Sequence, residues 1–296
     1  MTGDAILILG LTAVTAINLL IATAILLKLR PAGIQHKDND KGNEAQGEIV
    51  PTKPMMTKSE ILAWRQKIIS EIEQERGTKV ITMIHKKELW PGPGGRSEIG
   101  MEDAETVLQQ IRHTPADKPI DLILHTPGGY AVAAQMMAMA MKFHPEQVTV
   151  MIPYYAMSGG SLMAVASDEI RMEKYSVLGP VDPQILVPDG NTWPAASLAL
   201  LPQKKRARYV SDTMLVMSDV AKLETENAIA FVTWLLEDKM KKERAAEAAD
   251  FLARGYLAHY TPITLEVMKR LGLNVIEGIP PKVYDLFKTF ATTDTF

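Results

Sequence analysis

Between residues 79 and 172 the sequence alternates short apolar runs with longer helical patterns. The predicted strands are residues 79–85, 120–125, 148–152 and 169–172, and the predicted helices between them are residues 102–112, 130–143 and 159–166. Apolar runs without a polar alternation are typical of strands buried on both faces, as in a parallel sheet covered by helices. The order of these elements therefore predicts an α/β domain with a largely parallel sheet.

The N-terminal segment at residues 5–27 contains no charged side chain. As a helix rising 1.5 Å per residue it would be roughly 34 Å long, enough to cross a bilayer core of about 30 Å with some tilt. A cleavable signal peptide fits less well because no basic residue precedes the run, and a buried core helix fits less well because no polar face is present. We predict a single-pass membrane anchor. Lys28 and Arg30 follow it, so the positive-inside rule places the large domain in the cytoplasm.

The rest of the chain divides by composition and periodicity. Residues 31–58 are rich in Pro, Gly, Asn and Asp, which is typical of a linker. An amphipathic helix is predicted from Ser59 to about Gly77, a loop-rich stretch between Pro183 and Pro202, and further helices from residue 212 to 254. The predicted segments are an anchor at 1–30, a linker at 31–58, a folded domain at 59–288 and a C-terminal tail at 289–296.

Composition excludes several kinds of site. The 296 residues contain no cysteine, so disulfides, cysteine-ligated metal centres and a cysteine nucleophile are ruled out. The 32 basic and 35 acidic residues give a net charge of −3, and no strong positive field is present to bind nucleic acid.

Two glycine-rich turns follow successive predicted strands. Thr-Pro-Gly-Gly at 126–129 ends one strand, and Ser158, followed by Gly159, opens a helix one β-α unit later. Consecutive glycines leave backbone N–H groups accessible to an anion, and a helix N-terminus stabilises negative charge. Each turn alone has a commoner structural explanation, as a tight turn or as an N-cap serine. Together they predict an acyl-transfer site with Ser158 as the nucleophile.

The order of the longer motifs resembles that of a known family. The resemblance rests on DKPIDLILHTPGG, SGGSLMAVASDEI, LGPVDPQI and HYTPITLEVMKRLGL, and it extends from about residue 79 to residue 275. These motifs resemble the serine dehydrogenase proteinase family, within the signal peptide peptidase A clan of membrane serine proteases and the ClpP/crotonase superfamily. The resemblance implies a ClpP/crotonase-like spiral domain, a nucleophile at Ser158 and a homo-oligomeric ring. It also implies oxyanion donors from the backbone of Gly128 or Gly129 and of Gly159.

The base that activates Ser158 is left open by the sequence. A serine hydroxyl is a weak nucleophile without a base. ClpP uses a Ser-His-Asp triad, but residues 181–184, where its histidine would be expected, are Val-Asp-Pro-Gln. The signal peptide peptidase branch instead implies a Ser-Lys dyad, for which Lys205 ranks above Lys204; a solvated basic patch is the alternative for both. His259 is a further candidate base, or a structural or substrate-site residue, and Asp182 could orient a base.

We expect a membrane-anchored serine endopeptidase that cleaves hydrophobic or membrane-derived peptides through an acyl-enzyme. Such a Ser-Lys mechanism needs no metal and no cofactor. A crotonase-type acyl-CoA enzyme is one alternative, although no pair of glutamates is evident near the turns, and a non-catalytic membrane scaffold that has lost its base is another. The expected partners are a peptide or membrane-protein substrate, the membrane and further copies of the chain, and not nucleic acid.

Overall fold

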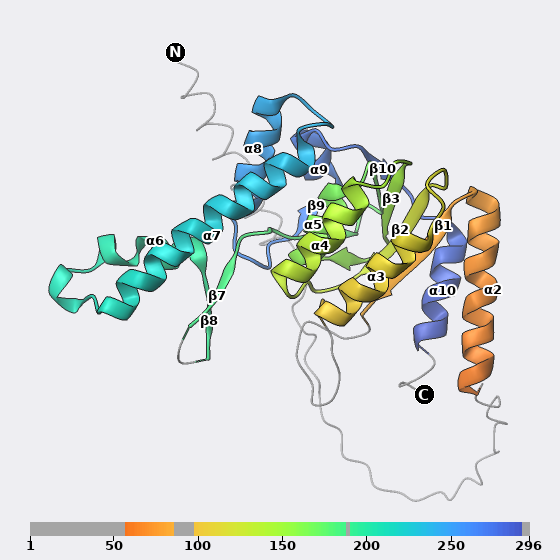
Figure 1. Ribbon diagram of the computed structural model, residues 1–296, viewed down its shortest axis with the longest axis horizontal. Helices are drawn as coiled ribbons and strands as arrows, with labels where there is room; N and C mark the ends of the chain where they lie inside the picture. The colour runs from red at the N-terminus through yellow and green to blue at the C-terminus, as the bar shows by residue number, and fades with distance from the viewer. Residues whose placement is uncertain (1–56, 86–97, 188–189, 292–296) are drawn as a thin grey trace, which may run out of the picture. The chain divides into compact units, whose positions relative to one another are not determined.

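The computed structural model describes residues 57–85, 98–187 and 190–291 (Figure 1). The predicted anchor at 1–30 lies outside these residues and stays a prediction. Within the described ranges, no helix is both long enough and apolar enough to span a bilayer.

The centre of the domain is a parallel sheet with the strand order β1-β2-β3-β5-β10. Its strands are β1 (Lys79–Ile84), β2 (Ile120–His125), β3 (Val148–Ile152), β5 (Glu169–Met172) and β10 (Val275–Glu277). The first three strands are neighbours in both sequence and space, and a helix joins each to the next, so this part of the chain winds as a spiral. The predicted α/β class with a parallel sheet is confirmed.

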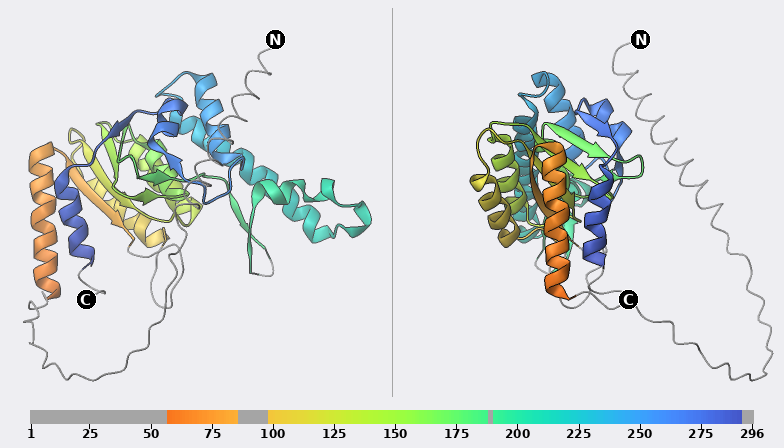
Figure 2. Two further views of the ribbon diagram at one scale, coloured as in Figure 1. Left: turned by 180° about the vertical axis from the view of Figure 1, so that it is seen from behind. Right: turned by 90° about the vertical axis from the view of Figure 1, so that its right-hand side faces the viewer.

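Helices cover both faces of this sheet. On one face lie α3 (Met101–His113), α4 (Ala131–Lys142) and α5 (Gly159–Ala166), and on the other α2 (Lys58–Arg76) and α10 (Pro281–Ala291) lie side by side (Figure 2). Successive strand residues point to opposite faces. Leu122 and Val150 belong to the apolar cluster under α3 and α4, whereas Ile123 and Met151 belong to the cluster under α2 and α10. Burial on both faces explains the continuous apolar runs in the sequence.

The ends of the domain differ slightly from the predicted bounds. Thr57 and Glu60 form a capping box that starts α2, and Gly77 ends the helix in the left-handed conformation with φ 69°. At the C-terminus, α10 continues to Ala291, and Thr289 within it is fully buried. The last turn of α10 therefore still packs on the domain beyond residue 288, where the tail was predicted to begin.

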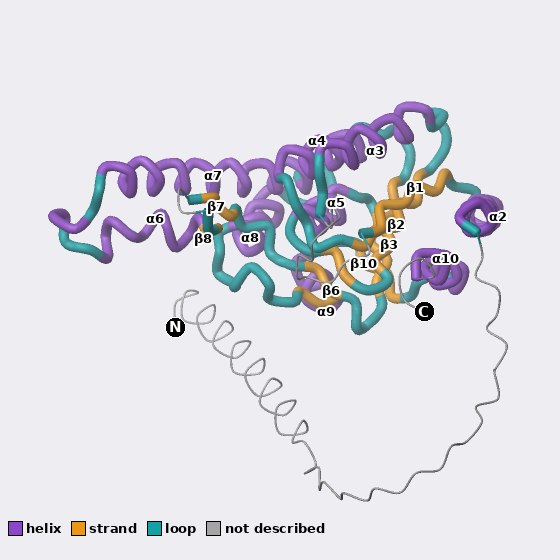
Figure 3. Tube along the Cα trace, turned by 90° about the horizontal axis from the view of Figure 1, so that it is seen from below, coloured by secondary structure: helices purple, strands orange, loops and turns teal. Residues whose placement is uncertain are grey.

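An arm formed by α6 (Ala195–Lys204) and α7 (Asp212–Leu236) projects away from the sheet (Figures 1 and 3). A loop-rich stretch was expected before Pro202, but the structure has the hairpin β7 (Gln184–Leu186) and β8 (Thr192–Pro194) there, followed by α6. Pro202 lies near the end of α6, and buried Ala195 and Leu198 pack α6 against α7. This packing outweighs the backbone hydrogen bond that proline removes. The remaining elements are β4 (Tyr155–Ala156), β6 (Val177–Leu178), the 3₁₀ helix η1 (Ala207–Tyr209), α8 (Lys242–Ala253), β9 (Ile263–Thr264) and α9 (Leu265–Leu271).

Candidate active site

Ser158 lies in the turn between β4 and α5, with φ 49° and ψ −114°. In the described part of the chain it is the only non-glycine residue with a positive φ. A non-glycine residue held in such a conformation costs about 1–3 kcal/mol, and such residues are concentrated at functional sites. Although Ser158 occupies the N-cap position of α5, its side chain makes no capping hydrogen bond. The structure therefore does not support the simple N-cap explanation, and the hydroxyl is available for chemistry.

Gly128 allows the two glycine-rich turns to approach each other. It has φ 101°, and a Cβ atom added to it would lie 2.8 Å from Ser158 Cβ and 2.9 Å from the Met157 carbonyl oxygen. Its own N–H donates to Thr126 Oγ1 at 3.1 Å, so this N–H is directed away from an oxyanion. The sequence left the first oxyanion donor open between Gly128 and Gly129; in the structure the Gly128 N–H has another acceptor, and the residue acts through its lack of a side chain.

Gly129 and Gly159 present the two N–H groups that fit an oxyanion hole. Neither group has a hydrogen-bond acceptor within the residues that the structure describes. Gly159 is the first residue of α5, whose leading N–H groups have no partner inside the helix. The Gly129 nitrogen lies 3.8 Å from the position that a Cβ on Gly159 would occupy, so the two glycines are adjacent. Two free N–H groups beside a serine can stabilise a tetrahedral oxyanion.

The glycine turn is fixed on one side by the segment that precedes α3. Ile99 N–H donates to the Gly128 carbonyl at 2.6 Å, and Tyr130 N–H donates to the Ile99 carbonyl at 2.9 Å. A side chain on Gly129 is excluded here, because its Cβ would lie 2.4 Å from the Ile99 backbone. The backbone of Gly129 is thus held at one orientation before any substrate arrives.

On the other side the turn is fixed by a buried polar chain that the sequence analysis missed. Thr126 Oγ1, which accepts the Gly128 N–H, lies 2.7 Å from His85 Nδ1. His85 Nε2 lies 3.6 Å from Asp103 Oδ2, and burial lowers the pKa of His85, which favours its neutral form. His85 follows β1 directly, so only the β1–β2 register, and no local motif, would have indicated that it lies beside Thr126.

Removing the Thr126 hydroxyl should impair catalysis more than binding. Thr126→Val keeps the side-chain shape but leaves the buried Gly128 N–H without an acceptor, which costs about 1–3 kcal/mol. Because the turn carrying Gly129 then loosens, we expect kcat to fall about tenfold or more with little change in KM. Steady-state kinetics on one peptide measures both constants. Thr114→Val is the matched control, because its hydroxyl donates to a helix carbonyl away from the site; equal effects of the two variants would contradict the role given to Thr126.

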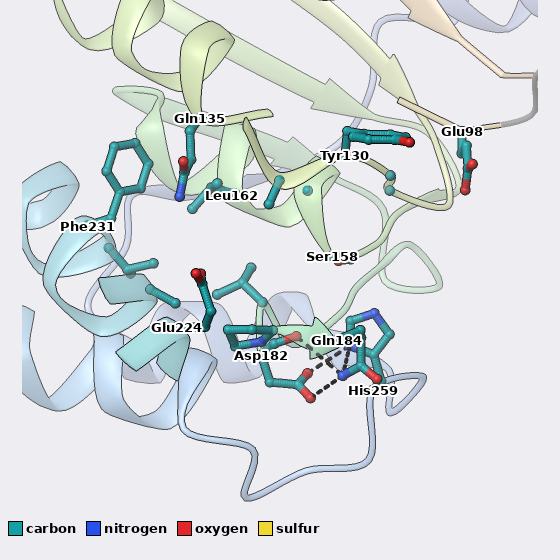
Figure 4. Close-up of a pocket in the computed structure, with 18 of the residues that line it drawn as sticks. Glu98, Tyr130, Gln135, Ser158, Leu162, Asp182, Gln184, Glu224, Phe231 and His259 are labelled. Atoms are coloured by element: carbon teal, nitrogen blue, oxygen red, sulfur yellow. Dashed lines mark hydrogen bonds and ion pairs between the residues drawn. The ribbon is translucent and has the colours of Figure 1, made fainter. Parts of the chain in front are cut away.

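His259 and Asp182 form a hydrogen-bonded pair in the site. His259 Nδ1 lies 2.8 Å from Asp182 Oδ1, and the Asp182 side chain is 2% exposed. The other carboxylate oxygen accepts from Gln184 Nε2 at 2.6 Å. A carboxylate only accepts hydrogen bonds, so Nδ1 donates to Asp182, and in the neutral imidazole Nε2 is then the acceptor. In Figure 4 the imidazole lies on the Ser158 side of Asp182 and Gln184.

One cavity brings these groups together. It has a volume of about 830 Å³ and is lined by Gly128, Gly129, Ser158, Gly159, Asp182 and His259, among others. No direct hydrogen bond joins Ser158 to His259 in the described chain, and such contacts often tighten only when substrate binds. The cavity thus combines a serine, a histidine oriented by a buried carboxylate and two free N–H groups. This set can attack a carbonyl carbon, transfer the proton and hold the oxyanion.

Lys204 and Lys205 lie elsewhere. Both are exposed at the end of α6, and neither lines the cavity. Asp212 begins α7 at the same end of the arm, and α7 extends roughly 24 Å from there to Ala228, which lines the cavity. The predicted Ser-Lys dyad with Lys205 or Lys204 is therefore not formed within one chain. The structure agrees with the alternative reading of these lysines as a solvated basic patch.

Lys239 contacts α5, but at the end opposite Ser158. Its Nζ donates to the carbonyl oxygens of Val165 (3.2 Å), Ala166 (2.5 Å) and Ser167 (2.6 Å). Burial lowers the pKa of Lys239 to about 8, which still leaves the amine mostly protonated at neutral pH. Lys239 therefore caps the C-terminus of α5 and is not a base for Ser158.

Lys239→Met should destabilise the folded domain. The methionine side chain fills similar space but leaves the three carbonyl oxygens without their charged donor, for an expected loss of about 2–3 kcal/mol in the free energy of unfolding. Denaturant titration followed by circular dichroism measures this loss. Lys242→Met, at the exposed start of α8, serves as the control and should lose almost nothing. Equal stability of the two variants would show that the cap contributes little.

Comparison with known proteins identifies the family of the chain. The sequence profile of the family described as ClpP-like SDH-type serine proteinase matches residues 49–293. Two relatives from Methanocaldococcus jannaschii are named as uncharacterized proteins. MJ1495 is 45% identical over 228 residues, 76% of either chain, and MJ0137 is 41% identical over 240 residues, 80% of this chain and 82% of the relative. Among solved structures, ClpP1 from Listeria monocytogenes aligns with a TM-score of 0.42 and 13% identity, over 71% of this chain and 97% of ClpP1. The protein belongs to the ClpP-like SDH-type serine proteinase family and is a serine peptidase.

Proposed function

We propose that the protein is a membrane-anchored serine endopeptidase in which Ser158 is the nucleophile, His259 the general base and Asp182 the residue that orients His259. One observation carries the assignment: Ser158 and the His259–Asp182 pair line the same cavity. We propose a Ser-His-Asp arrangement in place of the Ser-Lys dyad expected from the sequence, because Lys204 and Lys205 lie at the end of the arm and do not line the cavity. The triad is recognised by geometry rather than by the order of its residues in the sequence.

The proposed reaction follows from the hydrogen bonds of the site. His259 Nε2 takes the proton from Ser158 Oγ as this oxygen attacks the scissile carbonyl, and the N–H groups of Gly129 and Gly159 hold the resulting oxyanion. Asp182 stabilises the imidazolium through Nδ1–H, and the imidazolium then protonates the leaving amine. Water, activated by the same base, releases the acyl group. In this assignment the chain has a nucleophile, a base and oxyanion donors, which argues against the non-catalytic scaffold.

Active-site labelling tests this assignment directly. A fluorophosphonate probe should modify the full-length chain at Ser158, as located by peptide mass spectrometry, and Ser158→Ala should abolish both the label and peptide hydrolysis. The Ser197→Ala variant, which changes an exposed serine of α6, should keep both. Labelling at another residue, or hydrolysis by Ser158→Ala, would overturn the proposal.

The anchor and the kind of substrate are supported by the sequence and by the cavity wall. The uncharged run at 5–27 and the basic residues after it support a single span with the large domain in the cytoplasm. Leu162, Phe231 and Val232 give the cavity an apolar section, which supports hydrophobic peptide segments as substrates. Extraction of the full-length chain by alkaline carbonate would contradict the anchor, and digestion of the domain by protease outside intact cells would contradict the orientation.

Exposed apolar side chains on the arm support a homo-oligomer. Leu200, Leu215, Val216, Val220 and Leu223 are each between 43% and 64% exposed. Apolar residues gathered on one projecting element mark an interaction surface, and we propose that further copies of the chain cover it. Sedimentation of the detergent-solubilised protein should show an oligomer that Val216→Glu dissociates. A wild-type monomer would contradict this proposal.

A further inference from the structure

We infer that the peptidase prefers substrates with a lysine or arginine side chain lying along the α7 wall of the cavity, with its charge at Glu224. The inference rests on the proposed function, because it assumes that a peptide bound at Ser158 fills the 830 Å³ cavity. The inference goes beyond the proposed function by specifying the charge of the preferred substrate side chain, which the apolar section of the cavity does not determine.

One face of α7 forms a wall of the cavity. Glu224, Asn227, Ala228 and Phe231 all line it, and their spacing of three, four and seven residues from Glu224 places them on one stripe of the helix. Leu162 of α5 lines the cavity as well, and Figure 4 shows Glu224, Leu162 and Phe231 on the same side of Ser158. The wall thus offers an apolar surface and a carboxylate together.

The Glu224 carboxylate has no ion-pair partner among the described residues, although other acidic residues of α7 do. Asp219 pairs with Lys222 and Glu226 pairs with Arg254, but both pairs lie outside the cavity. The described lining of the cavity includes no lysine and no arginine. A positive charge that neutralises Glu224 within the cavity would therefore come from the substrate.

In the described chain two other carboxylates line the cavity, those of Asp182 and Glu98, but neither is part of the α7 wall. Asp182 is bonded to His259 and Gln184, so it is not available to a substrate cation. Glu98 lies on the other side of Ser158 from Glu224, as does Tyr130 (Figure 4). Carboxylates thus lie on both sides of Ser158, and Glu224 is the one on the side of Leu162 and Phe231.

Lysine and arginine combine the two properties that this wall can bind. Their methylene groups can lie along Phe231 and Leu162 while the charged end reaches Glu224. An apolar side chain would gain the same apolar contact without the ion pair. An acidic side chain would meet like charge, which discriminates against it. The expected order of preference is therefore basic, then apolar, then acidic.

Matched peptides test the inference in the full-length enzyme. A peptide series that differs only by lysine, norleucine or glutamate, placed in turn at each position around the scissile bond, separates charge from apolar contact. At one position we expect lysine to exceed norleucine in kcat/KM by about fivefold at low salt, with a smaller ratio at high salt. Glu224→Gln should remove this ratio, and Glu224→Lys should reverse the order of lysine and glutamate. Glu266→Lys, on the exposed surface of α9 and away from the cavity, is the control and should change neither.

The outcomes separate this inference from the proposed function. Equal rates for the lysine and norleucine peptides, or an unchanged ratio in Glu224→Gln, would overturn the preference while leaving the peptidase reaction intact. Loss of the ratio in Glu98→Gln but not in Glu224→Gln would show that the cation binds on the other side of Ser158, and would overturn the assignment to α7. Hydrolysis of no peptide, together with no labelling of Ser158, would instead refute the proposed function.

Discussion

His259→Ala should lower kcat/KM for peptide hydrolysis by about 10³–10⁴-fold, whereas Lys205→Ala should remain close to wild type. The large loss is expected because Ser158, His259 and Asp182 act as a unit, so removing one of them removes most of the rate enhancement that the three give together. Asp182→Asn should be nearly as severe, because an amide that donates toward Nδ1 would favour the wrong tautomer of His259. Initial rates and the rate of fluorophosphonate labelling of Ser158 measure these effects on the nucleophile itself.

The lysine variants make this prediction discriminating. Lys204→Ala, Lys205→Ala and the double variant should be assayed in the full-length oligomeric enzyme, so that any contribution from a neighbouring copy is present. All three should keep near-wild-type rates, because the lysines are exposed at the end of the arm. An inactive lysine variant together with an active His259→Ala would support the Ser-Lys dyad and refute the role given to His259.

Features of the fold that depend on local sequence could be predicted. Strands β1, β2 and β3 follow from apolar runs, and the end of α2 follows from Gly77, whereas the capping box of Thr57 and Glu60 starts the helix just before the predicted Ser59. The arm could not be predicted in the same way. The sequence between Pro183 and Pro202 indicated loops. The contacts that stabilise α6 come from α7, which is a separate element.

The candidate site divides along the same line. Ser158, Gly129 and Gly159 lie in turns that local patterns mark, and the structure places them together. The base depends instead on residues that are distant in the sequence. Asp182 follows β6 and His259 precedes β9, and only the antiparallel pairing of β6 with β9 brings the two segments together. A sequence does not show such a pairing. The family resemblance favoured Lys204 and Lys205, which lie at the end of the arm and do not line the cavity.

Even the local part of the site has a property that composition does not reveal. Ser158 has a positive φ where the two glycine turns meet, and serine itself has no preference for this conformation. The same holds for Gly128, which looks like an N–H donor in the sequence but acts in the structure by having no Cβ.

Gly128→Ala should therefore both destabilise the domain and abolish peptidase activity. The new methyl group would lie 2.8 Å from Ser158 Cβ and 2.9 Å from the Met157 carbonyl oxygen, in a backbone conformation that alanine rarely adopts. Because these neighbours are backbone and a short side chain, the turn itself must move, which displaces Ser158 from Gly129 and Gly159. We expect about 2–4 kcal/mol less stability from strain and overpacking. The loss in kcat should be about 10³-fold or more, since both nucleophile and oxyanion donors shift.

Gly77→Ala separates backbone strain from this steric effect. Gly77 also has a positive φ, 69°, but a Cβ there would meet nothing within 4 Å. We expect a loss of about 1 kcal/mol, the usual cost of replacing a left-handed glycine, with unchanged activity. Denaturant titration and kinetics on the same peptide compare the two variants. If Gly128→Ala resembled Gly77→Ala in both measurements, the close approach of the two turns would not be what positions Ser158. If it lost stability but kept its rate, the glycine would serve the fold and not the oxyanion site.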